Sequence, residues 1–172
     1  IVQEQLWRNG HSRLDAILLS HADIDHFNAV PELVETMGVD TVCVHRSFLD
    51  FRQTAVREIV ADWIQAGART QLVWGGDQLW PEGDVRLEIL QPSETELFDG
   101  DNANSVVLLV EYAGRSLLLT GDLDRSGLQA LIQNHPPRDL DLLQLPHHGS
   151  LAANPPDLPR WCRPEFGLIS GG

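Results

Sequence analysis

Apolar residues recur along this chain with two different periods, which separate the expected helices from the expected strands. Spacings of three, four and seven residues predict a helix over 30–37, ended by Gly38. The same spacing predicts a helix over 56–64, ended by Gly67, and a shorter helix over 127–132. The apolar faces of the first two helices consist of Val30, Leu33, Val34, Met37, Val56, Ile59, Val60, Trp63 and Ile64. Each face is expected to pack against a core.

Short apolar runs between polar or glycine-containing segments predict strands. The expected strands are 16–19, 42–44, 71–74, 85–90, 106–112, 116–120, 140–145 and 166–170. Ala113 and Gly114 join two of them as a tight hairpin. Strands and helices therefore alternate in the first half of the chain and a β-rich meander follows, so the expected fold class is α/β.

Length and composition favour a single domain over 1–172. The chain has 172 residues, of which 42% are hydrophobic and 22% charged, and this suffices for a substantial core. No apolar run approaches the roughly 18 residues of a membrane-spanning helix, so we expect a soluble domain without an anchor of its own. The chain opens at Ile1 without a secretion signal, and we expect it to be a piece of a longer protein.

Charge and cysteine content narrow the functional classes. Twelve basic and 25 acidic side chains give a net charge of −13, which repels phosphate backbones and disfavours nonspecific binding to nucleic acid. Divalent cations held by acidic residues would offset this charge locally. The chain has two cysteines, Cys43 and Cys162, and we expect Cys43 to be a buried free thiol rather than a metal ligand.

The densest polar cluster follows the predicted strand 16–19. His21, Asp23, Asp25 and His26 place four potential metal ligands within six residues. A loop that leaves a strand can turn several such side chains toward one cation. The alternative for Asp25 and His26 is a helix cap with a buried polar contact. The cluster predicts a metal-dependent hydrolase.

Two later strands also end in polar residues. Asp122 and Asp124 follow one apolar run, and His147 and His148 follow another. In sheets covered by helices, functional sites gather at the carboxyl ends of strands. The three clusters are therefore expected to meet in one cleft.

Other ionisable and aromatic residues are expected to have structural roles. The isolated histidines should lie at the surface or in packing contacts, and the isolated aspartates in turns or in solvent. The tryptophans should lie in packing contacts, with a place beside a cleft as the alternative for Trp74 and Trp80, which flank a glycine-rich turn. These residues are His11, His45, His135, Asp15, Asp77, Trp63, Trp74 and Trp80.

Four segments together resemble the metallo-β-lactamase superfamily, and within it the C-terminal domain of ComEC-type competence proteins. They are LSHADIDH at 19–26, Asn104-Ser105 before a strand, LLTGDLD at 118–124 and LPHHGS at 145–150. The resemblance implies a metallo-β-lactamase-like four-layer αββα sandwich. It also implies truncation at both ends, because such domains open with further strands and carry another histidine after the last strand.

The resemblance implies a set of metal ligands as well. In that arrangement, His21 and Asp23 face one metal position. Asp25 and His26 face a second position, and Asp122 bridges the two.

Two residues depart from the commonest pattern of the superfamily, because Asp23 and Asn104 stand where it has histidines. Oxygen ligands suit harder cations than imidazole does, so the expected cofactor is zinc or manganese, as one ion or two. The roles of His147 and His148 stay open between ligating metal and binding a phosphoryl oxygen. We expect the second role for the pair and keep His147 as a candidate ligand.

A metal-activated water is the expected nucleophile of such a site. Asp23 or Asp124 would orient the water or accept its proton. His147 or His148 would stabilise charge on a phosphodiester or protonate the leaving group. The resemblance implies a nuclease that acts on DNA, with single-stranded DNA as a candidate substrate, in competence-type uptake. The parent protein would then be embedded in the bacterial cytoplasmic membrane and tether this domain to it.

Two alternatives remain open. The same site could serve a small-molecule metallohydrolase that cleaves a lactone, thioester or lactam. Alternatively, the chain is a degenerate, non-catalytic domain of a membrane transporter, which Asp23, Asn104 and the short ends favour. Metal analysis tests this last alternative first.

Overall fold

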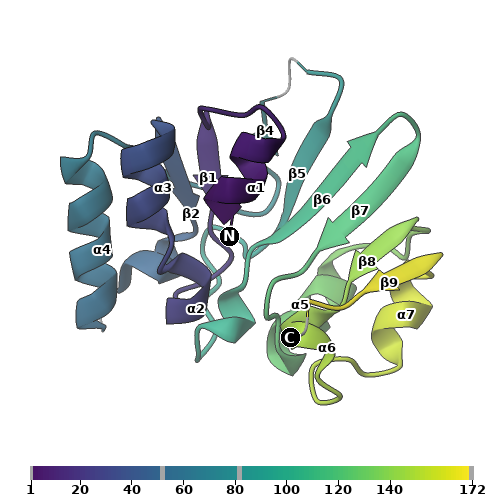
Figure 1. Ribbon diagram of the computed structural model, residues 1–172. Helices are drawn as coiled ribbons and strands as arrows, with labels where there is room; N and C mark the ends of the chain where they lie inside the picture. Colours follow the sequence, from purple (N-terminus) through teal and green to yellow (C-terminus); the bar gives the residue numbers. More distant parts are fainter. Residues whose placement is uncertain (1, 51–52, 81–82, 171–172) are drawn as a thin grey trace. The chain divides into compact units, whose positions relative to one another are not determined.

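The computed structural model describes residues 2–50, 53–80 and 83–170. The chain divides into two compact units, Ile1–Leu72 and Val73–Gly172, each with its own sheet (Figure 1). The first polar cluster of the sequence belongs to the first unit, and the two later clusters belong to the second.

Parallel strands with helical connections form the first unit. Its sheet has the order β1-β2-β3, and both pairings are parallel. The elements are α1 (Val2–Arg8), β1 (Ala16–Leu18), α2 (Ile24–Phe27), α3 (Val30–Met37), β2 (Thr41–Val44), the 3₁₀ helix η1 (Arg46–Asp50), α4 (Thr54–Gln65) and β3 (Arg69–Leu72). Parallel neighbours need a crossover connection, which α3 and α4 supply. The expected alternation of strands and helices is confirmed.

Helices α3 and α4 lie side by side and pack on the sheet with the faces that the sequence predicts (Figure 1). α3 buries all four of its predicted apolar residues, and Gly38 ends it with a φ of 59°. α4 buries Val56, Ile59, Val60 and Trp63. Ile64 is instead 55% exposed, and the buried face of α4 ends at Trp63. Its predicted place in the core is wrong.

A longer mixed sheet forms the second unit. Its order is β4-β5-β6-β7-β8-β9, antiparallel as far as β7 and parallel from β7 to β9. The elements are β4 (Gln78–Leu79), β5 (Arg86–Gln91), the 3₁₀ helix η2 (Asn102–Asn104), β6 (Val107–Tyr112), β7 (Arg115–Leu119), α5 (Arg125–Asn134), β8 (Leu142–Gln144), α6 (Pro146–Gly149), α7 (Asp157–Cys162) and β9 (Phe166–Leu168).

The core of the second unit lies between this sheet and helices α5 and α7 (Figure 1). Leu128 and Leu131 of α5 and Leu158 of α7 are fully buried. The β6–β7 turn has positive φ at Ala113 (49°) and Gly114 (75°), as a tight two-residue hairpin requires. The predicted hairpin is confirmed.

Local hydrogen bonds explain where elements differ from their predicted bounds. The strand expected over 71–74 is β3, which ends earlier because the Trp74 N–H donates to the Asp77 carboxylate in a turn. α5 exceeds the expected 127–132 because Asp124 caps its N-terminus. The other expected strands are present with slightly shifted ends. The hydrophobic pattern did not predict α1, β4 or α7, since α1 has no fully buried residue and β4 is very short.

The tryptophans differ in burial. Trp63 is buried in the first unit, and its Nε1 donates to the Thr70 hydroxyl at 2.9 Å. Trp74 is half-buried. Trp80 is exposed, so the packing role expected for it is wrong.

Cys43 and Cys162 are buried free thiols. Burial raises the pKa of each thiol to about 11, so both stay protonated and unreactive at neutral pH. The expectation for Cys43 is confirmed.

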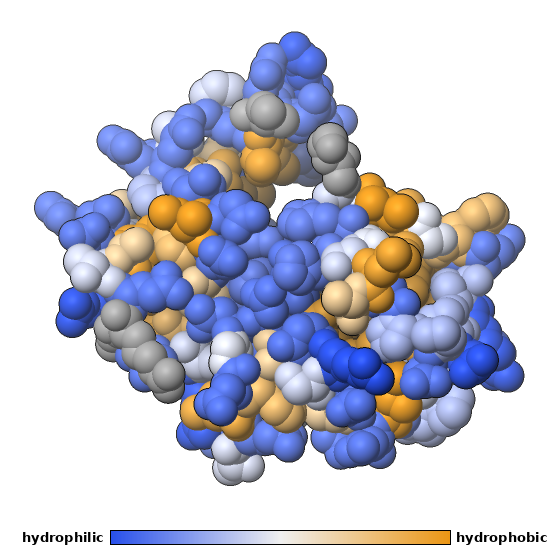
Figure 2. All heavy atoms as spheres, turned by 90° about the horizontal axis from the view of Figure 1, so that it is seen from below, coloured by the Kyte–Doolittle hydropathy of each residue, from blue (hydrophilic) through white to orange (hydrophobic). Residues whose placement is uncertain are grey.

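Hydrophilic side chains cover most of the face drawn in Figure 2, with hydrophobic residues reaching it in separate areas. Within residues 2–50, 53–80 and 83–170, no helix is both long and apolar enough to cross a membrane.

Candidate functional site

The first polar cluster lies on the loop that leaves β1. Leu19 is the last residue tied to the sheet, where its N–H donates to the Cys43 carbonyl at 3.0 Å. Beyond it, the loop turns two imidazoles toward each other. His21 is 2% exposed, His26 is half-buried, and their ring centroids are 4.2 Å apart. The first unit thus brings these two predicted ligands together.

The Ser20 hydroxyl contacts both imidazoles. Its Oγ lies 3.0 Å from His21 Nδ1 and 3.4 Å from His26 Nδ1. Histidines that ligate a metal usually engage their second ring nitrogen in a hydrogen bond, which fixes the tautomer and the ring plane. Nε2 is therefore the candidate ligand atom of each ring. Asp25 lies on the same side, because its Oδ2 is 3.8 Å from His26 Nε2.

Asp23 has a structural role in this loop. Its Oδ1 accepts a hydrogen bond from the Ile24 N–H at 2.8 Å and caps α2. The helix cap considered for Asp25 and His26 is thus formed by Asp23, and those two residues lie inside α2. The roles of Asp23 as ligand and as proton acceptor stay predictions.

The second polar cluster lies in the second unit, where β7 ends. The Thr120 and Gly121 N–H groups donate to the side-chain oxygen of Gln144 at 3.1 and 3.4 Å, and the Thr120 hydroxyl donates to the Gln144 carbonyl at 2.8 Å. Gly121 has a φ of 55°, a conformation that favours glycine. Gln144 on β8 therefore holds the turn that carries Asp122, which is 5% exposed.

His148 faces the Asp122 carboxylate. Its Nδ1 lies 2.7 Å from the Ser170 carbonyl oxygen, which only accepts, so Nδ1 carries the proton in the neutral ring. Its Nε2 lies 3.5 Å from Asp122 Oδ2. Two acceptor atoms that face each other are stabilised by a cation or a proton between them. The 3.5 Å approach therefore fits either a protonated imidazole or a cation held by the two atoms.

His147 has a different neighbour. The Asn102 amide nitrogen lies 3.5 Å from its Nδ1. An amide nitrogen only donates, so this contact is compatible with an Nδ1 that accepts and an Nε2 that carries the proton. A protonated Nε2 can donate to a phosphoryl oxygen but has no lone pair for a metal. The roles of His147 and His148 in ligating metal or binding substrate stay predictions.

The backbone of this histidine pair is strained. His147 and His148 have φ values of 49° and 55°, in a region that non-glycine residues rarely adopt. Such strain collects at functional sites. The His147 N–H donates to the Gly121 carbonyl at 3.2 Å, which ties the histidine loop to the turn before Asp122.

Asp124 caps helix α5. Its Oδ1 accepts hydrogen bonds from the Ser126 N–H at 2.9 Å and the Gly127 N–H at 3.1 Å. The Ser126 hydroxyl donates to the same oxygen at 2.7 Å. The predicted catalytic role of Asp124 stays a prediction, and its observed contacts are those of a helix cap.

Asn104 braces a loop. It is 4% exposed, and its Oδ1 accepts from the Phe98 N–H at 3.0 Å. Its Nδ2 donates to the carbonyls of Phe98 (2.8 Å) and Gly100 (2.7 Å). The amide is therefore engaged at both ends by backbone.

Histidines outside the clusters have the structural surroundings that the sequence predicts. His45 is buried, with Nδ1 2.9 Å from the Ser47 hydroxyl. His135 is half-buried, and its Nε2 donates to the Leu90 carbonyl at 2.9 Å. His11 is exposed, and so is Asp15, one of the aspartates expected in turns or in solvent.

Sequence reasoning missed the residues that hold the candidate groups. Ser20, Asn102 and Gln144 each contact a predicted site residue or its turn. Ser20 lies inside the motif at 19–26 and Gln144 directly precedes the motif at 145–150, but no spacing in the sequence shows that a hydroxyl or an amide supports a site residue.

The sequence matches a known family over most of its length. The family model described as the metallo-beta-lactamase superfamily matches residues 2–154. This range contains every predicted site residue.

Curated relatives include proteins of several bacteria. ComE operon protein 3 of Bacillus subtilis is 28% identical over 167 residues, which cover 97% of this chain and 21% of that protein. Competence protein ComA of Neisseria gonorrhoeae is 32% identical over 168 residues, with 95% and 21% covered. Recombination protein 2 of Haemophilus influenzae is 26% identical over 160 residues, with 92% and 18% covered. The chain spans about a fifth of the length of these relatives.

A solved structure shares the fold. Igni18, described as a novel metallo hydrolase from the archaeon Ignicoccus hospitalis, gives a TM-score of 0.51 at 15% identity, covering 90% of this chain and 62% of that one. This likeness concerns the fold, and it agrees with the α/β class expected from the sequence.

Proposed function

Because the chain belongs to the metallo-β-lactamase superfamily, we propose that it is a metal-dependent phosphodiesterase that hydrolyses DNA in competence-type uptake. The family match bears out the resemblance carried by the four motifs, and the chain has a hydrolase fold of that superfamily. Two relatives are named a competence protein and a recombination protein. These names support DNA as the substrate class.

The proposed metal centre takes its ligands from the polar clusters that the sequence predicts. His21, Asp25 and His26 are proposed from the first cluster, with Asp23 as a further oxygen donor. Asp122 and, on the tautomer argument, His148 in place of His147 are proposed from the later clusters. The observation that carries the assignment is the 3.5 Å approach of His148 Nε2 to Asp122 Oδ2 while Nδ1 is held by a backbone carbonyl.

Zinc and manganese are the proposed ions. Imidazole nitrogens suit zinc, and the carboxylates of Asp23, Asp25 and Asp122 also suit manganese. One or two ions are compatible with this donor set.

A divalent cation supplies the positive charge that activates a water molecule for attack at neutral pH. His147 donates its Nε2–H to a non-bridging oxygen of the phosphodiester. Asp23 can accept a proton at the carboxylate oxygen that does not cap α2. Asp124 keeps that role as an alternative, although one of its oxygens already accepts from α5.

Charge favours a substrate that approaches through the cation. The net charge of −13 repels phosphates elsewhere on the chain. A flexible single strand can avoid this repulsion better than a duplex can, so we propose single-stranded DNA. We also propose that the parent protein, about five times longer, is embedded in the bacterial cytoplasmic membrane and tethers this domain to it.

The test combines metal analysis with cleavage. We expect the metal-free chain to bind Zn²⁺ or Mn²⁺ stoichiometrically and then to cleave a labelled single-stranded oligonucleotide. Asp122→Asn should abolish both properties. The matched control is Asp99→Asn, an exposed aspartate of the same unit, which should leave both unchanged. Cleavage that survives Asp122→Asn would show that this site is not the catalyst.

The alternatives predict different results from the same experiment. Turnover of a lactone, thioester or lactam probe without DNA cleavage would assign the site to a small-molecule hydrolase. A folded chain that binds no divalent cation and turns over no probe would be a degenerate, non-catalytic domain.

A further inference from the structure

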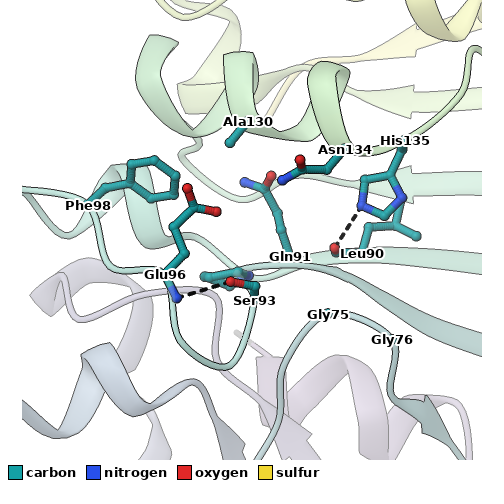
Figure 3. Close-up of a pocket in the computed structure, with 11 residues that line it drawn as sticks. Gly75, Gly76, Leu90, Gln91, Ser93, Glu96, Phe98, Ala130, Asn134 and His135 are labelled. Atoms are coloured by element: carbon teal, nitrogen blue, oxygen red, sulfur yellow. Dashed lines mark hydrogen bonds between the residues drawn. The ribbon is translucent and has the colours of Figure 1, made fainter.

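A pocket of about 350 Å³ lies in the second unit, between the end of β5 and helix α5 (Figure 3). This volume is within the range of roughly 300 to 1,000 Å³ seen for small-molecule sites. Gln91, Glu96 and Phe98 extend into it from one side, and Ala130 and Asn134 border it from α5 (Figure 3). The polar groups assigned to hydrolysis do not line it.

Gln91 is the polar group that folding does not explain. The residue is 6% exposed, and its Nε2 has no hydrogen-bond partner among the described residues. A buried donor without an acceptor costs about 1 to 3 kcal/mol. A ligand that offers a carbonyl oxygen would remove this cost. The pocket therefore presents a donor in need of an acceptor.

Glu96 provides the complementary acceptor. Its exposed carboxylate extends toward the same space as Gln91 (Figure 3). The loop that carries it is fixed, because the Glu96 N–H donates to the Ser93 hydroxyl at 3.0 Å. Phe98, held by its two backbone bonds to Asn104, adds an aromatic ring. The pocket thus combines an amide donor, a carboxylate acceptor and an aromatic surface.

Gly75 and Gly76 close part of the wall with backbone. The Gly75 N–H donates to the Pro92 carbonyl at 2.7 Å, and a Cβ at Gly75 would meet the Leu90 carbonyl oxygen at 2.7 Å. Arginine and lysine are absent from the described residues that line the pocket. The ionisable groups of the lining are Glu96 and His135, and the His135 Nε2 donates to the Leu90 carbonyl at 2.9 Å. The Glu96 carboxylate therefore disfavours phosphate and favours a neutral heterocycle.

We propose that this pocket binds a nucleobase, and guanine in preference to the others. Guanine presents an acceptor, O6, beside two donors, N1–H and the N2 amino group. Gln91 donates to O6, and the two oxygens of Glu96 accept from the two donors in a bidentate bond. Adenine, cytosine and thymine lack this run of one acceptor and two donors. Phe98 contacts the base with its ring.

Helix α5 links the pocket to the candidate site. Asp124 caps one end of the helix, next to Asp122, and Asn134 borders the pocket at the other end. At about 1.5 Å per residue, the helix spans roughly 15 Å. A strand whose phosphate lies at Asp122 could place a nearby base in the pocket. This assignment of the base to the strand being cleaved rests on the proposed function, whereas base binding itself does not.

The test measures binding without catalysis. The 172-residue chain is titrated in EDTA with guanosine, inosine and cytidine by isothermal titration calorimetry. We expect saturable binding of guanosine, and binding of inosine, which lacks the N2 amino group, that is weaker by about tenfold or more. Glu96→Gln should weaken guanosine binding to a similar extent. Glu94→Gln, an exposed glutamate of the same loop outside the pocket lining, should not.

Gln91→Met keeps the size of the side chain and removes its donor. It should weaken guanosine binding without lowering the melting temperature, because a buried unsatisfied donor disappears. Guanosine that shows no saturable binding, or binding unchanged by both Gln91→Met and Glu96→Gln, would overturn the proposal.

Oligonucleotides locate the source of the base. In EDTA, a single strand with one guanine should bind more tightly than the same strand with inosine there. If guanosine binds and the two strands do not differ, base binding stands and its assignment to the cleaved strand falls. These binding measurements contain no metal. Their outcome therefore does not depend on whether the chain cleaves DNA in the earlier test.

Discussion

A single hydrogen bond at each ring underlies the different roles that we propose for the two adjacent histidines, His147 and His148. A carbonyl oxygen at His148 Nδ1 and an amide nitrogen at His147 Nδ1 select opposite tautomers. His148 can then offer a lone pair to a cation, and His147 can offer a proton to a substrate. The sequence placed both residues in the site but could not separate them, because their partners, Ser170 and Asn102, lie 22 and 45 positions away.

Ser20 offers a test of the imidazole pair in the first unit. Ser20→Ala removes the hydroxyl that contacts Nδ1 of both His21 and His26. We expect metal affinity to fall by about tenfold, because loss of a group that orients metal ligands typically has an effect of this size. The measurement is a competitive metal titration with a chromogenic chelator.

The matched control for Ser20→Ala is Ser47→Ala, which removes a similar hydroxyl from Nδ1 of His45 in the same unit. Metal affinity should not respond to it. Equal affinity of Ser20→Ala and the unaltered chain would show that Ser20 does not orient the ligands.

At the scale of elements, helix α5 shows how a polar motif can have two explanations. Asp124 belongs to the LLTGDLD motif, and its carboxylate also caps α5. The sequence predicted the motif and a helix over 127–132 but not the link between them, since the cap depends on the backbone angles of Asp124 rather than on spacing. Asn104 is similar, because its three bonds to the backbone of 98–100 follow from a loop that no periodic pattern predicts.

Replacing Asp124 separates these explanations. Asp124→Ala removes the cap of α5, so we expect the free energy of unfolding in urea to fall by about 1 kcal/mol. Asp124→Asn keeps a capping oxygen but removes the base, and it should retain both stability and turnover. A stable Asp124→Asn chain without turnover would instead assign the proton-accepting role to Asp124.

Asp141, the residue before β8, contacts β7 and makes the stability of the second unit depend on pH. Asp141 accepts hydrogen bonds from the Arg115 guanidinium and from the Ser116 N–H and hydroxyl. The Arg115 hydrogen bond and the Ser116 bonds lower the pKa of Asp141 from 3.8 to about 2. Since the folded protein has the lower pKa, this contribution to stability is complete above a pH of about 4 and is lost as the pH falls toward about 2.

We therefore expect unfolding by urea to become easier between these pH values. Asp141→Asn should flatten that part of the profile, measured by circular dichroism at several pH values. The control Asp99→Asn replaces an exposed aspartate of the same unit and should leave the slope unchanged. The same slope in the Asp141→Asn chain would show that other carboxyl groups cause it.

At the scale of the whole chain, the sequence predicted the fold class more completely than it predicted the individual helices and strands. Periodicity found α3, α4 and most strands because their buried faces are regular. It missed α1 and β4, which bury too little surface to leave a pattern. The four motifs predicted the family, which the match over residues 2–154 bears out. The single domain over 1–172 and the meeting of the clusters around one cation stay predictions.

The net charge of the chain leads to the last prediction, which concerns how its affinity for DNA depends on salt. With 25 acidic and 12 basic residues, the chain repels phosphates in EDTA, and added NaCl should strengthen its weak binding by screening that repulsion. Basic DNA-binding proteins show the opposite dependence, because they release counterions. Mn²⁺ at matched ionic strength should raise affinity much further, since the proposed site would hold its charge where a phosphate would bind.

The measurement is fluorescence anisotropy of a labelled, hydrolysis-resistant phosphorothioate single strand. Asp122→Asn should lose the Mn²⁺ effect and keep the NaCl effect, because only the first depends on the bound cation. Asp99→Asn should keep both. Affinity that falls with NaCl in EDTA would mean that a basic surface, rather than a metal ion, brings the phosphates to this acidic chain.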